Sequence, residues 1–286
     1  MIYVSAQRGV DTNAGTFLAP LRQIGKAIAL SPVGETVVVV DSGDYKHFTV
    51  DKTLAIVAER VAARIHPDAF PGAAVTVAAG SADVVLLQGL TITGRAGAVG
   101  VRFSEGRALH LEGCAIGGFV ATADSRPGCA IDAQQGILNA TDTVLHDNVT
   151  GIDVSSGRVV LDGCSIRGDG TRDSEGLFIR GTSYVGVVRC VVSDHGDTGI
   201  YVRGDPGVHR PFLSLTQSMI AHNRVGMYAD RTGQVYLNSS TITLNDTGLY
   251  TLNGGVIYTR GSSSVIGNFS QDISGNVLFA ESDITS

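Results

Sequence analysis

Apolar and polar residues alternate along most of the chain in short runs, and one arrangement of positions recurs. The stretch from Arg158 to Ile179 shows it: an alternating run through Leu161, a corner at Gly163, an isolated Ile166, a polar turn, and a second alternating run led by Gly176. Short period-two runs separated by turns indicate β-strands, and they leave no room for a helix between them. A unit that recurs in this way is typical of a solenoid.

The isolated apolar residue, which we call the anchor, returns every 22 to 28 residues. The anchors are Ile92, Ile116, Val144, Ile166, Val192, Ile220 and Ile242. Five positions before the anchor the residue is again apolar, with Asn139 as the one departure. Strands led by glycine follow, at Gly100, Gly151, Gly176, Gly199, Gly226 and Gly248. We therefore predict a coil of short parallel strands, each coil stacked about 4.8 Å above the last.

The repeat resembles the right-handed parallel β-helix of the pectate-lyase-like superfamily. The opening Ile2-Tyr3-Val4-Ser5, with Asp11, Gly15 and Pro20, is similar to the start of many bacterial β-helix proteins. The resemblance implies an all-β, single-stranded β-helix of about ten coils and a short helix that plugs the first one. Pro20 to Leu30 fits that helix, with Leu21, Ile24, Ala27 and Ile28 on one face and Pro20 in the first turn.

The continuous repeat favours a single elongated domain over residues 1–286. We expect the N-terminal strand and capping helix in residues 1–32, the coils in 33–264, and an irregular coil or cap in 265–286. Aromatic residues make up only 6% of the chain, tryptophan is absent and there are 37 glycines, which suits a narrow core of small aliphatic side chains.

The formal charge of −6 makes nucleic acid an unsuitable partner, because phosphate binding needs a basic surface. No apolar run reaches the roughly 18 residues of a membrane helix, so we expect no membrane partner. Met1 leads straight into a predicted strand without a signal peptide. We expect a mature form, with a start Met added, of a protein exported to the periplasm or exterior of a bacterium; an intracellular protein is the alternative.

Two sets of residues are assigned to structure. Cys114, Cys164 and Cys190 each lie two positions before an anchor, with Asp142 at that position in the coil between the first two, and we expect buried free thiols. Asn148, Asn223 and Asn245 each lie three residues before a coil's glycine. Asparagine tolerates the left-handed conformation, and asparagine ladders are common in the superfamily that the repeat resembles.

Candidate chemistry gathers near the turn that follows the anchor. Insertions at 117–128 and 168–175 leave this turn and should flank a shallow cleft, whose floor is His146, Asp147 and Asn148; a third insertion, 204–211, leaves another corner. Neighbouring turns add Arg167, Asp194 and His195. Histidine and aspartate on adjacent coils suit proton transfer, so His146, Asp147, Arg167, Asp194 and His195 are the candidate catalytic residues, against the simpler interpretation of a solvated surface.

The insertion 168–175 carries three carboxylates that could hold a hard cation. These are Asp169, Asp173 and Glu175, but they lack the spacing of an EF-hand loop and Arg172 competes for the same charges. We expect no cofactor, and calcium is the weaker alternative.

A second candidate is a row of outward-facing residues, two after each coil's glycine. It comprises Asp153, Phe178, Tyr201, Tyr228 and Tyr250. Such a ladder stabilises a sheet, and an exposed row of rings also offers a platform for sugar faces or a protein partner. We therefore take Phe178, Tyr201, Tyr228 and Tyr250 as substrate-binding candidates, together with Arg172, His222 and Arg224.

Two hypotheses for function follow. The first is a protein that binds or processes a polysaccharide, most plausibly an acidic one by elimination or epimerisation, with an arginine offsetting the uronate and a histidine removing a proton. The signatures of pectate lyases, galacturonan hydrolases and alginate epimerases are missing, although Asp194-His195-Gly196 is similar to one galacturonan hydrolase element. The alternative is a non-catalytic surface module that holds a glycan or a second subunit through its outer sheet or its C-terminal end.

Overall fold

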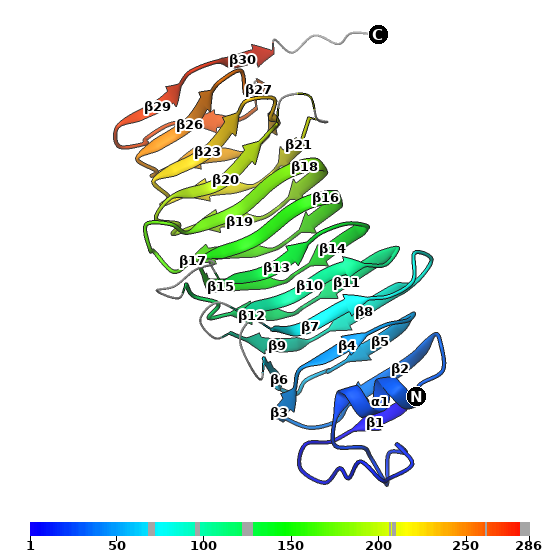
Figure 1. Ribbon diagram of the computed structural model, residues 1–286. Helices are drawn as coiled ribbons and strands as arrows, with labels where there is room; N and C mark the ends of the chain where they lie inside the picture. The colour runs from blue at the N-terminus through cyan, green and yellow to red at the C-terminus, as the bar shows by residue number, and fades with distance from the viewer. Residues whose placement is uncertain are drawn as a thin grey trace. The chain divides into compact units, whose positions relative to one another are not determined.

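The computed structural model describes residues 1–67, 72–94, 98–121, 128–205, 207, 210–260 and 262–280. It comprises two compact units, residues 1–145 and 146–286. Within each unit short β-strands pair in parallel with the equivalent strands of the coils before and after, as the ribbons of Figure 1 show. The predicted all-β parallel solenoid with one short helix is confirmed. None of the helical segments among the described residues could span a bilayer.

Three ladders of parallel strands make up the first unit. One contains β1 (Ile2–Val4), β2 (Glu35–Val39), β5 (Leu54–Val57), β8 (Val84–Gln88), β11 (Ala108–Glu112) and β14 (Ile137–Thr141). The second contains β4 (Phe48–Val50), β7 (Ala73–Ala78), β10 (Val99–Glu105) and β13 (Cys129–Ala133). The third contains β3 (Gly43–Lys46), β6 (Ala63–His66), β9 (Leu90–Thr93) and β12 (Ala115–Gly117).

The predicted capping helix is present as α1 (Ile24–Leu30), which packs on β1 to β4 at the first coil. Ile24, Ala27 and Ile28 are buried on one face, as expected. The predicted start at Pro20 is wrong. Leu21 instead forms a parallel bridge with Val4, which uses its backbone groups for strand pairing. The helix therefore begins only at Ile24.

The second unit also has three faces, which we number for use below. The first face holds the starts of β16 (Thr150–Asp162) and β18 (Glu175–Val188), then β20 (Thr198–Arg203), β23 (Val225–Asp230), β26 (Thr247–Leu252) and β29 (Gln271–Ser274). The second face holds the ends of β16 and β18, then β21 (Phe212–Thr216), β24 (Gln234–Asn238), β27 (Val256–Arg260) and β30 (Val277–Ala280). The third face holds β17 (Ser165–Gly168), β19 (Val191–Ser193), β22 (Met219–Ala221), β25 (Thr241–Thr243) and β28 (Ser264–Val265).

Strand pairing continues beyond residue 264, where we expected the regular coils to end. Both β29 and β30 pair in parallel with the preceding coil, the latter as far as Ala280. Their coil leaves large apolar side chains in solvent, since Phe269 is 71% and Phe279 is 67% exposed.

The predicted anchor Val144, in β15 (Val144–Asn148), is wrong by one residue. Val144 is 43% exposed, whereas Leu145 is buried, so Leu145 is the anchor of that coil. Asp142 has a φ of +47° and occupies the left-handed corner that Gly163 takes in the template, which moves the following residues by one position. The apolar residue five positions before the anchor is then the buried Ala140, and the apparent departure at Asn139 disappears.

The same one-residue shift changes which residue of this coil aligns with Cys114, Cys164 and Cys190. Thr143 rather than Asp142 follows the left-handed corner, and its Oγ1 accepts a hydrogen bond from the backbone N–H of Cys114. In the second unit the N–H groups of Cys164 and Cys190 donate to Cys190 Sγ and Ser218 Oγ. Burial raises the pKa of the Cys114 thiol to about 11. These cysteines are therefore buried members of a thiol and hydroxyl ladder, as the structural assignment predicted.

Candidate functional site

A ladder of polar side chains, buried except for the half-buried Asn268, follows the third face of the second unit. Each lies three residues after its anchor: Asn148, His195, Asn223, Asn245 and Asn268. Asn223 Nδ2 donates to Asn245 Oδ1 at 2.9 Å, and Asn245 Nδ2 donates to Asn268 Oδ1 at 2.9 Å. Asp272 ends the ladder by accepting from Asn268 Nδ2 at 2.8 Å. The structural assignment of the asparagines is confirmed.

His195 takes an asparagine's place in this ladder, which does not suit the catalytic role we expected. Its backbone N–H donates to Asn223 Oδ1 at 3.0 Å, and only 1% of the residue is exposed. Neither ring nitrogen has a hydrogen-bond partner among the described residues. The nearby Ile166 carbonyl raises the pKa of the ring and so offsets part of the lowering caused by burial. Burial lowers the pKa of His195 to about 4. The ring is therefore a neutral, buried group at pH 7, beneath the surface of the groove that the residue helps to line.

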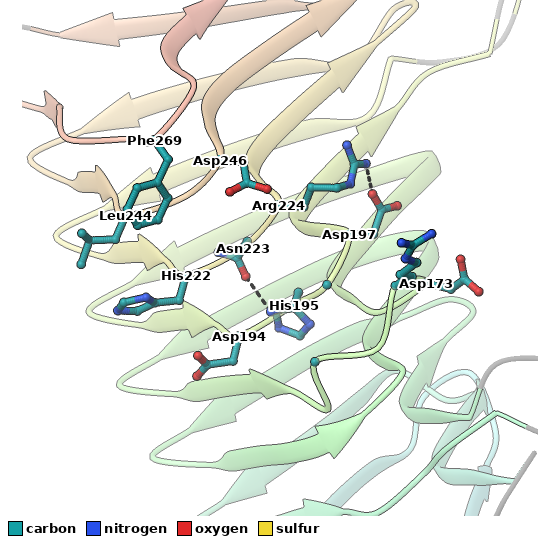
Figure 2. Close-up of a pocket in the computed structure, with 13 residues that line it drawn as sticks. Asp173, Asp194, His195, Asp197, His222, Asn223, Arg224, Leu244, Asp246 and Phe269 are labelled. Carbon is teal, nitrogen blue, oxygen red and sulfur yellow. Dashed lines mark hydrogen bonds and ion pairs between the residues drawn. The ribbon is translucent and has the colours of Figure 1, made fainter.

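The residues on either side of the ladder turn outward and line a groove of about 860 Å³ (Figure 2). Before the ladder come Asp194, His222 and Leu244, all with positive φ, which places them at the left-handed corner of the turn. After it come Arg224, Asp246 and Phe269. The groove is thus made by four successive turns, and its lining changes along the coils from charged side chains to the exposed pair Leu244 and Phe269.

The insertion 168–175 borders the charged end of the groove. Asp169 Oδ1 accepts hydrogen bonds from the N–H and hydroxyl of Thr171, which folds the loop on itself. Ser174 then docks it on the next coil, because Gly196 N–H donates to Ser174 Oγ at 2.8 Å. Arg172 and Asp173 are thereby held at the groove. The 117–128 insertion includes residues outside the described part of the chain.

Glu175 follows this loop and begins the first face. It is half-buried, and burial, together with the nearby carboxylates of Asp197 and Asp153, raises its pKa to about 7. Both neighbours have cationic partners: Asp197 pairs with Arg224, and Asp153 makes two hydrogen bonds with Arg180, at 3.1 and 2.9 Å. One carboxyl poised near neutrality therefore lies beside two ion-paired carboxylates.

The row of rings lies on the first face. In each strand the ring is three residues after the position that Glu175 occupies in β18. In the aromatic strip, Phe178, Tyr201, Tyr228 and Tyr250, successive ring centroids are 5.3, 4.6 and 4.9 Å apart, which confirms the predicted spacing. The Tyr201 hydroxyl donates to the buried Asp230 at 3.3 Å. Because the rings stack on one another, they mainly offer their edges to a ligand.

Three further candidates lie together on adjacent coils of the third face. Asp147 Oδ2 lies 2.9 Å from His146 Nδ1, and its Oδ1 lies 3.6 Å from an Arg167 nitrogen. The three side chains are 38 to 55% exposed and do not line the groove. The predicted grouping of His146, Asp147 and Arg167 is present, but Asp194 and His195 are not part of it.

The calcium alternative finds no support in the geometry. Among the residues that the structure describes, no three His, Cys, Asp or Glu side chains are arranged to hold a metal ion. Within the loop, Asp169 is engaged with Thr171, Asp173 lines the groove and Glu175 faces two other carboxylates.

Comparison with known proteins identifies the family. The family described as "right handed beta helix region" matches residues 74–270, which is most of the chain. The chain belongs to the right-handed β-helix family. No curated protein sequence matches it.

Solved structures with the same fold share little sequence with this β-helix protein. Pectate lyase Pel9A aligns over 97% of this chain and 74% of its own, with a TM-score of 0.54 and 17% identity. An alginate lyase from Paenibacillus sp. str. FPU-7 aligns over 90% and 95%, with a TM-score of 0.56 and 12% identity. A rhamnogalacturonan lyase aligns over 98% and 87%, with a TM-score of 0.53 and 14% identity. At these identities the likeness shows the fold alone.

Sequence reasoning placed Glu175 only in a weak cation site and overlooked Asp197 and Asp246. A signal for Glu175 was available in the repeat. Strand partners at its register position are Thr150, Thr198, Val225 and Thr247, all uncharged, so a glutamate there is the exception.

Proposed function

We propose that this β-helix protein processes a polysaccharide that lies along the groove and the aromatic strip, and that Glu175 is its proton donor. The observation that carries the proposal is the position of Glu175 between the groove residue Asp197 and the strip residue Phe178. The fold supports the substrate class, since the structural neighbours named above are polysaccharide lyases.

The carboxyl groups favour cleavage of a glycosidic bond by hydrolysis. With a pKa of about 7, Glu175 is largely protonated just below neutrality and can give its proton to the departing glycosidic oxygen as the bond to the anomeric carbon breaks. A water adds to that carbon, and its proton passes to an ionised carboxylate, for which Asp197 is our candidate. Glycoside hydrolysis uses one protonated and one ionised carboxyl group, which flank the bond that is broken.

The charges of the groove do not select an acidic glycan. Asp173, Asp194, Asp197 and Asp246 line it, against Arg172 and Arg224, and Arg224 is already paired with Asp197. A uronate carboxylate would therefore meet more negative than positive groups. The substrate unit bound here is proposed to be neutral.

Elimination or epimerisation of an acidic glycan is the second candidate, and one observation favours it. His146 and Arg167 lie on adjacent coils, bridged by Asp147, which is the pair of groups that this chemistry needs. His222 and Arg224 in the groove are a further such pair. A non-catalytic module that only binds glycans is the remaining alternative.

A panel of neutral and uronate polysaccharides separates these functions by their products. Hydrolysis yields new reducing ends without ultraviolet absorbance, whereas elimination yields an absorbing unsaturated product. We expect reducing ends, and we expect Glu175→Gln to lower the rate at least about a hundredfold, the usual contribution of a general acid. Glu112→Gln, an exposed glutamate of the first unit, is the matched control and should keep full activity.

Three outcomes would contradict the proposal. Absorbing product whose formation depends on His146 would assign the reaction to elimination. Full activity in folded Glu175→Gln would remove Glu175 as the proton donor. Binding without any product over the whole panel would favour the non-catalytic module.

A further inference from the structure

The second face of the same unit carries a second row of rings. Phe212, Tyr236 and Tyr258 lie at outward positions of β21, β24 and β27, and their successive centroids are 5.2 and 4.6 Å apart. We call these three residues the second strip. Tyr184 continues the row toward β18, 6.4 Å from Phe212, and is 57% exposed.

A hollow of about 230 Å³ lies beside the second strip. Its walls are the rings of Phe212 and Tyr236 on one side and Thr216, Asn238 and Arg260 on the other, with Ser214 between them. Thr216 pairs in register with Asn238, and Arg260 lies at the next equivalent position, at the end of β27. The three side chains therefore form one polar column along the coils. The hollow is separate from the groove, with which it shares no lining residue.

Several polar groups here have no protein partner in the described part of the chain. The side chains of Tyr236, Tyr258 and Arg260 make no hydrogen bond or ion pair with the other described residues. Other arginines of this unit are matched: Arg180 with Asp153, Arg189 with Asp162 and Arg231 with Asp205. Among the described residues that line the hollow, only Arg260 is charged at pH 7, so the hollow has a net positive charge.

We propose that this hollow is a second glycan site, which binds one uronic acid unit of an acidic polysaccharide. The apolar side of a sugar ring packs against the outer edges of Tyr236 and Phe212, and the Arg260 guanidinium binds the carboxylate through paired hydrogen bonds. Thr216 and Asn238 offer hydroxyl and amide groups to the sugar hydroxyls. The volume suits a single ring rather than a long chain.

The second site rests on the proposed function only in that its ligand is also a polysaccharide. Unlike the groove, it prefers an acidic sugar unit. A polysaccharide with mixed neutral and acidic units would be held by Arg260 on the second face and cleaved at Glu175 on the first. The second site then acts as an anchor for polymer, and short substrates do not need it.

Binding of a uronic acid trisaccharide and of its methyl ester, measured by calorimetry, tests the site. We expect the acid to bind the wild type and the Glu175→Gln variant equally, and the ester at least tenfold more weakly. Arg260→Gln should reduce affinity for the acid to that for the ester. The double variant Tyr236→Thr, Tyr258→Thr should abolish binding of both. Phe17→Thr, which replaces an exposed ring of the first unit, is the matched control and should change neither.

The site would be disproved by unchanged binding in Arg260→Gln, whose exposed side chain can be replaced without loss of folding. It would equally be disproved by no binding to the wild type, or by loss of binding in Glu175→Gln, which would place the acid in the groove. Because these measurements need no turnover, their failure is distinct from a failure of the hydrolysis assay.

Discussion

The two rows of rings in the second unit look alike in sequence and differ in what surrounds them. The aromatic strip of the first face is tied into the protein: the Tyr201 hydroxyl bonds the buried Asp230, and Arg180 lies 5.5 Å above the Phe178 ring. On the second face, Tyr236 and Tyr258 stack 4.6 Å apart, and Arg260, whose side chain pairs with no other described residue, lines the hollow beside Tyr236. Stacking is therefore common to both rows, and their polar neighbours are what distinguish them.

The same contrast holds between the groove's floor and its rim. His195 and the asparagines face inward and serve the ladder, whereas their chain neighbours Asp194 and Arg224 face outward at the groove. A shift of one residue within a turn decides which polar group is buried and which can meet a ligand.

The largest effect expected is on the floor of the groove, at His195. The pKa of His195 is about 4 in the folded chain against 6.5 unfolded, so the unfolded state binds more protons between these values. Stability conferred by the neutral ring is therefore complete above about pH 6.5 and falls by about 3 kcal/mol as the pH drops to 4. His195→Asn, which restores the common ladder residue, should flatten this acid loss in urea unfolding measured at pH 4 and 7. An equal loss in both proteins would show that other groups cause it.

A smaller effect of opposite sign is expected at Glu175, which lies near the groove residue Asp197. Its pKa is about 7 in the folded chain against 4.5 unfolded, so the folded state binds more protons in that window. Stability therefore declines as the pH rises from 4.5 through 7, and Glu175→Gln should remove the decline. We compare the Tm of the variant with that of the wild type at each pH. This difference should favour the variant by about 2 to 4 °C more at pH 8 than at pH 5. An identical difference at both pH values would mean that the carboxyl is not shifted.

The smallest effects compare the two rows directly. Tyr201→Phe removes a donor from the buried Asp230 and should cost about 1 kcal/mol of unfolding free energy. Tyr258→Phe removes a hydroxyl with no recorded protein partner among the described residues and should change stability by less than about 0.5 kcal/mol. Chemical denaturation of both variants is the measurement. Equal costs would show that the second strip is as firmly engaged as the first.

Most of the fold could be predicted because the repeat is periodic. The inward positions of each strand, the capping helix face and the asparagine ladder follow from apolar spacing and turn chemistry alone, and Ile24, Ala27 and Ile28 are buried as expected. The error at Val144 arose at a corner. Any residue that tolerates positive φ can replace glycine there, so Asp142 concealed the register.

The candidate site was predicted only in part. Proximity in the sequence identified the turn that holds Asp194, His222 and Arg224, and the loop that holds Arg172. It could not show that His195 points into the core, because histidine is compatible with both faces of a turn. Nor could it show that Arg224 is matched by Asp197 of the preceding coil, since that pairing depends on how coils of unequal length come into register.

The sequence by itself determined that this chain is a parallel β-helix, because the order of apolar and turn residues within one coil is local information repeated many times. The tertiary structure alone decided the chemistry of individual groups. The raised pKa of Glu175, the neutral ring of His195 and the position of Arg260 beside Asn238 each depend on residues from other coils. Burial and Coulomb interactions act over a few ångströms in space, and in a solenoid those neighbours are 22 to 28 residues away along the chain.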